Sequence, residues 1–296
     1  MMRTYRIAAA IGLVTALGGA SAPRQPGIEI IGPAELFAAG IASTASSEVR
    51  LTISPDGRTA LWFSRNRSGG AGGYDIWISR RVNGEWSEAQ PVPFNSPTRD
   101  FDPAFSADGR QVYFCSDRPG GLGGDDVYRV AVTQGGFGPV EALGPGVNGP
   151  GNEYAPMLSP DGMTLLFASN RPGGAGRYDL YTARRQGSGF AAARPLSGAV
   201  NSAADEFDAT FLADGRTIVF ARAGDMQADR VDLFQASPTK RGRYDAGTIL
   251  PASVNMPGRD SYGPMLDWSQ PDRLLFSGQR AGATSMELYL VRYRPR

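Results

Sequence analysis

The stretch GNEYAPMLSPDGMTLLFASNRPGGAGRYDLY, residues 151–181, is one cycle of a pattern that occurs five times after about residue 45. Its turn, Ser159-Pro160-Asp161-Gly162, has counterparts that begin at Ser54, Ser106 and Leu212, and a worn fifth copy begins at Ser269. The first four turns are spaced 52, 53 and 53 residues apart. Periods of this size are typical of propellers, solenoids and other repeat arrays.

Each cycle predicts four strands. The turn joins two strands, because proline at its second position presets φ and glycine at its fourth accepts a positive φ. A glycine-rich loop follows, as in Arg171-Pro172-Gly173-Gly174, then a third strand that begins with an acid, as at Asp179, and a weaker fourth strand near an aromatic residue, as at Phe190. The second strand is apolar on both faces, which indicates sheets covered on both sides. Such a unit is a propeller blade.

The predicted fold is all-β, a single β-propeller of five four-stranded blades. Its repeats run at about 46–98, 99–151, 152–204, 205–258 and 259–296. The fifth repeat lacks a fourth strand, whereas Ala34-Glu35-Leu36-Phe37 lies in the matching phase upstream of the first turn. We therefore expect an amino-terminal strand, from about residues 28–40, to close the last blade and remove the free sheet edges.

The repeats resemble the WD40-like (PD40) β-propeller repeats found in the propeller of TolB. The marks of the resemblance are the SPDG turn, the run Phe167 to Gly174 and the strand Tyr178 to Tyr181, and it covers about residues 45–296. It implies the same propeller fold and docking to a peptidoglycan-associated partner. The α/β domain that precedes the propeller in TolB has no counterpart in the repeats.

Residues 1–22 read as a secretory signal peptide, followed by the propeller over residues 23–296. Arg3 and Arg6 form a basic start, residues 7–17 an apolar centre, and residues 18–22 a small-residue end. The apolar run is too short to span a bilayer as a helix. We expect a periplasmic or secreted protein that is soluble once the signal is removed, with no membrane span.

Composition excludes several classes of function. There is no histidine and a single cysteine, so Ser-His-Asp and Cys-His catalysis, histidine-ligated metals and two-cysteine motifs are ruled out. The formal net charge of +1 without a basic cluster argues against nucleic acid as a partner. No loop alternates acids in the manner of an EF-hand. We expect no metal, no cofactor and no catalytic residue.

One series of charged residues predicts structural pairs within the blades. An arginine four residues after a phenylalanine recurs together with the acid that begins the third strand. The expected pairs are Arg67 with Asp75, Arg118 with Asp126, Arg171 with Asp179, and Arg280 with Glu287. The fourth repeat has Gly224 in the arginine's phase, and Arg222 or Arg230 is the expected substitute.

A second series places acids before or within the first strands, which line the channel of a propeller. The candidate ligand-binding residues at this channel mouth are Glu48, Asp100, Asp102, Glu153, Glu206, Asp208 and Asp260. One alternative is that these acids bond neighbouring loop amides. The other is that the rim binds a polar ligand or a cation. Asp102 and Asp208 are the more individual members, since Arg50, Ala155 and Gly263 occupy their phase in the other repeats.

The expected function is therefore that of an exported, non-catalytic propeller that binds a protein or a cell-envelope component through its loop faces. The alternative is a carbohydrate-active enzyme or lectin that uses the carboxylates at the channel mouth. A scaffolding role in an envelope assembly is a third reading.

Overall fold

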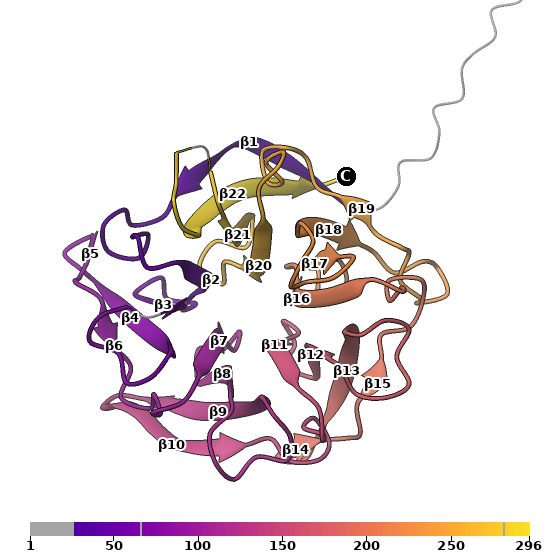
Figure 1. The fold of residues 1–296 in the computed structure, drawn as a ribbon, viewed down its shortest axis with the longest axis horizontal. Helices are drawn as coiled ribbons and strands as arrows, with labels where there is room; N and C mark the ends of the chain where they lie inside the picture. The colour runs from indigo at the N-terminus through magenta and orange to yellow at the C-terminus, as the bar shows by residue number, and fades with distance from the viewer. Residues whose placement is uncertain (1–26, 66, 281) are drawn as a thin grey trace, which may run out of the picture.

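Five antiparallel sheets stand around a central axis in the computed structural model, which describes residues 27–65, 67–280 and 282–296. Figure 1 shows them as the blades of a ring, with one strand of each blade at the centre. Every element in the described residues is a strand or a turn. The prediction of an all-β, five-bladed propeller is confirmed; the predicted signal peptide lies outside the described residues.

The strands follow one order from the channel outward in each blade. Blade 1 contains β2 (Glu48–Ile53), β3 (Thr59–Arg65), β4 (Tyr74–Val82), β5 (Glu85–Trp86) and β6 (Gln90–Pro91); blade 2 contains β7 (Asp100–Phe105), β8 (Gln111–Ser116), β9 (Asp126–Thr133) and β10 (Gly136–Ala142). Blade 3 contains β11 (Glu153–Leu158), β12 (Thr164–Ser169), β13 (Asp179–Gln186), β14 (Gly189–Phe190) and β15 (Arg194–Pro195). Blade 4 contains β16 (Asp205–Phe211), β17 (Ile218–Ala223), β18 (Asp232–Ala236) and β19 (Thr248–Ile249); blade 5 contains β20 (Ser261–Leu266), β21 (Arg273–Gly278), β22 (Glu287–Pro295) and β1 (Ile28–Leu36).

The last blade is closed by the amino-terminal strand. β1 pairs antiparallel with β22, from Ile28 opposite Pro295 to Leu36 opposite Tyr289. The first and last strands of the described residues lie side by side there, in indigo and yellow in Figure 1. The expected closing strand is confirmed. It gives β22 a partner on each side, so that strand has no open edge in this ring.

The repeated turn forms as its residues predict. In blade 3 the Gly162 N–H donates to the Ser159 carbonyl at 2.8 Å, and Gly162 has a φ of +70°. Asp161 accepts from the Ser159 hydroxyl and, at 3.0 Å, from the Met163 N–H. Equivalent turns in blades 1, 2 and 4 begin at Ser54, Ser106 and Leu212. All four turns lie on the same face of the ring, which we call the turn face. The opposite face is the channel face.

The fourth blade departs from the predicted pattern at its outer edge. Tyr244 forms isolated bridges with Gly198 and Pro238, and β19 begins only at Thr248. The segment before it is held by its own turn, in which the Gly242 N–H donates to the Thr239 carbonyl at 2.9 Å. The aromatic residue therefore precedes the outer strand here, whereas Trp86, Phe137 and Phe190 lie within theirs.

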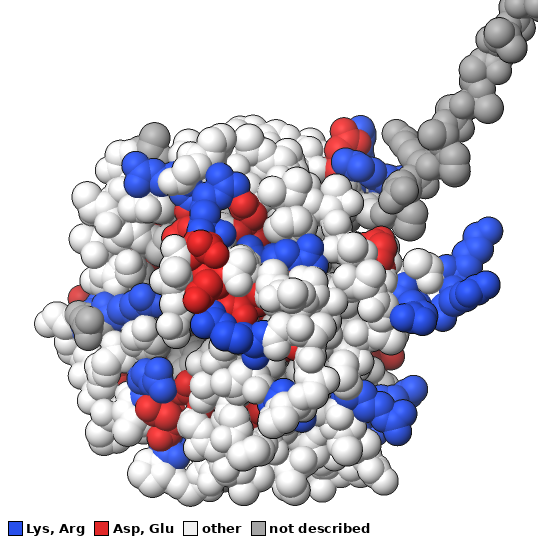
Figure 2. Space-filling model, turned by 45° about the vertical axis from the view of Figure 1, so that its right-hand side comes forward, with Lys and Arg blue, Asp and Glu red and all other residues white. Residues whose placement is uncertain are grey.

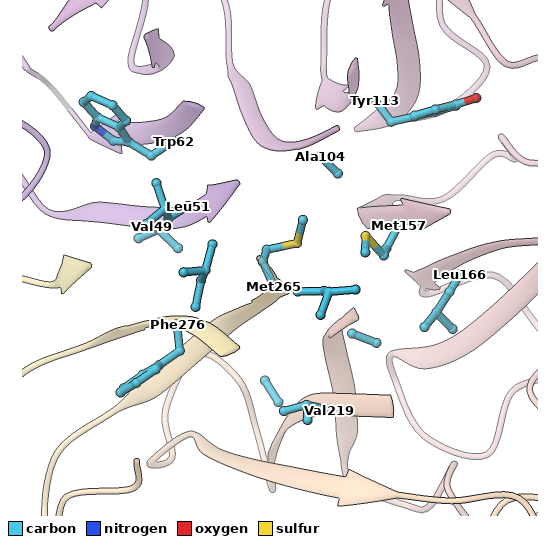
Figure 3. Close-up of a cluster of buried hydrophobic side chains, with 14 of the residues drawn as sticks. Val49, Leu51, Trp62, Ala104, Tyr113, Met157, Leu166, Val219, Met265 and Phe276 are labelled. Atoms are coloured by element: carbon cyan, nitrogen blue, oxygen red, sulfur yellow. The ribbon is translucent and has the colours of Figure 1, made fainter. Parts of the chain in front are cut away.

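The apolar core fills the space between neighbouring sheets and the middle of the ring. Figure 3 shows Leu51, Ala104, Met157 and Met265, from four of the innermost strands, near the centre of this cluster. Phe276, Trp62 and Tyr113 lie further out from the centre of the cluster. No helix of the described residues is long and apolar enough to cross a membrane.

Candidate functional site

The innermost strand of every blade carries a β-bulge at the same place. In blade 2, Phe101 pairs with Cys115 and Ala104 with Tyr113, so two residues oppose Phe114 alone. The bulged residue in each blade has a positive φ, between 48° and 61°: Arg50, Asp102, Ala155, Asp208 and Gly263. A bulge re-aims a side chain and is a designed feature of a strand. Because this one recurs in all five blades, it belongs to the architecture, and the residue type at each position gives the channel its chemistry.

Arg50 lies across the channel. Its side chain is fully buried, and Nη2 donates to the Ala155 carbonyl at 3.0 Å and the Ala209 carbonyl at 3.4 Å. One guanidinium therefore links blade 1 to blades 3 and 4. Its Nε and Nη1 have no hydrogen-bond partner among the described residues. Arg50 thus blocks the channel and is a buried positive charge there.

Trp268 covers the other end of the channel. It follows β20 on the turn face, is 9% exposed, and donates from Nε1 to the Phe105 carbonyl at 2.9 Å. Phe105 ends β7, so the indole of blade 5 reaches past blade 1 to blade 2. The channel therefore opens towards the channel face.

That opening is a pocket of about 620 Å³, which we call the channel pocket. Six aromatic side chains line its wall together with charged ones: Phe63, Tyr74, Phe101, Tyr154, Phe207 and Tyr262. Asp102 and Asp208 line its deep part, and the segment 226–231 forms part of its rim. A concave site in which aromatic surface and convergent polar groups meet is a candidate ligand pocket.

The aromatic wall was missed at the level of sequence, although a signal exists. Phe101, Tyr154, Phe207 and Tyr262 each directly precede the bulged residue of their strand, and Val49 holds that position in blade 1. An aromatic residue in four of five equivalent positions marks a shared surface once the bulge is known. The rings of Tyr154 and Tyr178 also stack, with centroids 5.2 Å apart.

Asp102 and Asp208 form a coupled pair of buried carboxyl groups. Asp102 Oδ2 accepts from the Ala155 N–H at 3.1 Å, and Asp208 Oδ2 from the Gly263 N–H at 3.0 Å. Burial, and then the charge of Asp208, raise the pKa of Asp102 to about 8, although Arg50 opposes the rise. Burial also raises the pKa of Asp208, again against Arg50. The pair therefore holds a proton near neutral pH, shared between two interacting sites.

This pair predicts a pH dependence of stability. The folded pKa of Asp102 lies above its ordinary value of 3.8, so the folded state binds more protons than the unfolded chain between about pH 4 and 8. The free energy of unfolding should fall as pH rises through that window. Asp102→Asn should flatten the dependence and be more stable than the parent at pH 9, by about 1 kcal/mol or more. Urea unfolding from pH 5 to 9 measures this.

The control is Glu141→Gln, which alters an exposed ion pair with Arg129. Its stability curve should run parallel to that of the parent protein, because surface pairs contribute little. A curve for Asp102→Asn that also runs parallel would contradict the shared buried proton.

Four of the predicted mouth acids build the loops of the channel face. Glu48, Asp100, Glu153 and Glu206 are fully buried, and each accepts from a backbone N–H four residues upstream. Burial raises the pKa of Glu48, Glu153 and Glu206. These four acids therefore bond neighbouring loop amides and do not form an open rim of carboxylates. Asp260 differs: it is half-buried, lines the channel pocket and accepts from the Val231 N–H at 3.1 Å.

The predicted pairing of arginines with third-strand acids is wrong. Four arginines reach inward instead, to an acid at or next to the start of the first strand of their blade. The distances are 3.7 Å for Arg67–Glu48, 2.5 Å for Arg118–Asp100, 3.0 Å for Arg171–Glu153 and 2.7 Å for Arg222–Glu206. Arg222 thus replaces the missing arginine of blade 4, as one of the two expected substitutes, while Arg230 pairs with Asp232. Arg280 has Ser261 in place of an acid and donates to the Ser253 carbonyl at 2.7 Å.

The third-strand acids close the glycine-rich loops instead. Asp75, Asp126 and Asp179 accept from backbone N–H groups of these loops, such as the Gly72 N–H at 3.2 Å. A Cβ on Gly174 would collide with the Asp179 carboxylate, which explains the glycine there. Glu287 accepts from the Tyr289 hydroxyl at 2.6 Å. In blades 1, 2 and 3 the first-strand acid and the third-strand acid both recur at a nearly fixed spacing from the arginine. Spacing alone therefore could not tell which of the two acids the arginine binds.

Charges on the molecule are mixed in sign. On the face in Figure 2, acidic side chains gather in groups bordered by basic ones, without a broad basic field. Among the described residues, no group of three or more potential ligand side chains could hold a metal ion.

Comparison with solved structures identifies related folds. TolB from Acinetobacter baumannii matches with a TM-score of 0.50 and 16% identity, over 85% of this chain and 56% of that one. A putative TolB from Agrobacterium tumefaciens matches with a TM-score of 0.52 and 15% identity, over 85% and 81%. In fold, the chain is a TolB-like propeller. An α-L-arabinofuranosidase from Lactobacillus brevis matches with a TM-score of 0.57 and 9% identity, over 83% and 90%.

Identities this low show the fold alone. The chain spans little more than half the length of the Acinetobacter TolB. No family model and no curated protein matches the sequence.

Proposed function

We propose that this TolB-like propeller is an exported, non-catalytic protein that binds a protein or cell-envelope component through its channel face. The observation that carries the proposal is the channel pocket, with six aromatic side chains on its wall and two buried carboxyl groups at depth. Arg50 and Trp268 block the channel beneath it, so a ligand enters and leaves by one face. Export rests on the signal-like residues 1–22.

Affinity capture from cross-linked envelope extracts tests this function. The matched variants are Ala228→Trp, in the exposed rim of the channel pocket, and Met163→Trp, at an exposed site next to a repeated turn. Both add one indole at the surface, but on opposite faces. The parent protein and Met163→Trp should capture the same component, and Ala228→Trp should lose it. Equal capture by all three proteins, or capture lost in Met163→Trp alone, would contradict binding at the channel face.

A carbohydrate-active enzyme is the second candidate. It is favoured by one observation: Asp102 and Asp208 both line the open pocket and interact strongly enough to shift the pKa of Asp102. Two carboxyl groups held in different protonation states are the usual equipment of a glycosidase. Turnover of aryl glycosides by the parent protein that disappears in Asp102→Asn would establish the enzyme and end the non-catalytic proposal.

A further inference from the structure

The wall of the channel pocket presents aromatic rings above two buried carboxyl groups, those of Asp102 and Asp208. Phe101 contacts Phe63, Tyr74 and Tyr154 with ring centroids 5.7–5.8 Å apart, so these rings form a continuous wall. Phe207 and Tyr262 complete the lining next to Asp208. The face of an aromatic ring attracts cations, and the attraction is stronger where water is excluded.

These two carboxyl groups have unused hydrogen-bonding capacity. Asp102 is 4% exposed and Asp208 is 7% exposed, and both line the pocket. Each uses Oδ2 for a backbone N–H of the next blade. Neither Oδ1 has a hydrogen-bond partner among the described residues. Two acceptors therefore face the pocket at the bottom of an aromatic wall.

Most of the positive charge at the rim is already neutralised. Arg99 is bound by Asp117 at 3.1 Å and Asp125 at 3.0 Å, and Arg230 is bound by Asp232. Arg65 lies over the Tyr74 ring at 5.0 Å. Asp229 and Asp260 add two further acids to the lining. The lining therefore carries four carboxyl groups against three guanidinium groups, Asp102, Asp208, Asp229 and Asp260 against Arg65, Arg99 and Arg230. Two of these guanidinium groups are paired with acids outside the lining.

We propose that the channel pocket binds an alkylammonium group, presented as a lysine side chain of a partner protein. Its methylene stem would pack on the aromatic wall while the ammonium group donates to Asp102 and Asp208, since a lysine carries three donors on an apolar stem. This site rests on the function proposed above, because it names the chemistry by which the channel face holds its partner.

Binding of a cation should expel the proton that the pair holds. The charged groups that act on Asp102 are Asp208, Arg50 and Asp125. Cys115 and Tyr262 also face the pair, and burial raises the pKa of both, to about 12 for Tyr262, so they stay neutral. An ammonium group between the two carboxyl groups favours their charged forms. Proton release on binding is therefore the distinguishing signature of the alkylammonium site.

Isothermal titration calorimetry with the full chain tests the site. The probes are N-acetyl-lysine methylamide, its Nε-acetylated form and neutral saccharides, each titrated in two buffers of different ionisation enthalpy. The lysine probe should bind, releasing close to one proton at pH 7 and almost none at pH 9. Nε-acetylation should weaken binding roughly tenfold or more, since it removes the charge. Asp208→Asn should weaken it similarly, whereas Met163→Ala on the turn face should bind like the parent protein.

Several results would overturn the site. Binding that survives Nε-acetylation, or binding without proton release at pH 7, excludes the ammonium contact. If Asp208→Asn does not fold, the number of protons that the parent protein releases on binding the lysine probe tests the site by itself. Binding of a saccharide in place of the lysine probe makes the pocket a lectin site. If the lysine probe fails while Ala228→Trp still abolishes envelope capture, the proposed function stands and the ammonium site falls. If the lysine probe does not bind and the parent protein captures no envelope component, both the ammonium site and the proposed function are contradicted.

Discussion

Replacing Arg50 by methionine should destabilise the propeller by about 3–5 kcal/mol, the usual cost of leaving a buried charge without its compensating partner. Arg50 lowers the pKa of both Asp102 and Asp208, and it joins three blades through the Ala155 and Ala209 carbonyls. Without it, the two carboxyl groups must take up protons or repel each other. Urea unfolding at pH 6 and pH 9 should show the larger loss at pH 9.

A double-mutant cycle separates charge from packing at this position. Adding Asp102→Asn to Arg50→Met should recover part of the stability, because one of the two uncompensated acids is then neutral. Arg50→Lys keeps the charge and should lose less than Arg50→Met. A loss below about 1 kcal/mol for Arg50→Met, independent of pH, would show that Arg50 does not compensate the pair.

The second large effect is expected at Arg171. Its guanidinium donates to Glu153 at 3.0 Å and lies over the Phe167 and Tyr181 rings at 5.2 and 4.9 Å. Glu153 is fully buried, so Arg171→Met leaves an uncompensated carboxylate behind. We expect a loss of about 3–5 kcal/mol in the free energy of unfolding.

Blade 5 offers the matched control. Arg280 lies over the Phe276 and Tyr289 rings at 5.2 and 4.9 Å, yet Ser261 stands where blade 3 has Glu153. Arg280→Met removes the same ring contacts without stranding an acid, so it should cost about 1–2 kcal/mol. Equal losses for the two variants, measured by urea unfolding, would mean that the buried acids contribute nothing specific to the blades.

Local chemistry explains which parts of the fold were predictable. The turn at Ser159–Gly162 depends only on four consecutive residues, so its aspartate and glycine are enough to predict it from the sequence. The closing strand was predictable from phase, because the fifth repeat ends one strand short and residues 34–37 fit the missing one. The bulged positions could also be aligned, since Arg50, Ala155 and Gly263 stand in the phase of Asp102 and Asp208.

The chemistry of the site depended on contacts between repeats, which spacing does not encode. Arg171 has two acids in phase, Glu153 and Asp179, and only the fold decides that it bonds the first. Arg50 contacts carbonyls more than a hundred residues away. The aromatic wall depends on a bulge that turns the residue before it towards the channel. The sequence of one repeat is thus enough to predict its blade, whereas the pocket depends on how the five blades are arranged around the channel.

Site-specific photo-cross-linking tests the central claim most directly. A photoreactive residue replaces Gln227, on the exposed rim of the channel pocket, or Met163, on the turn face, and each protein is irradiated in an envelope extract. A discrete cross-linked product from position 227, with none from position 163, is the predicted result. A discrete product from position 163 and none from position 227 would contradict binding through the channel face.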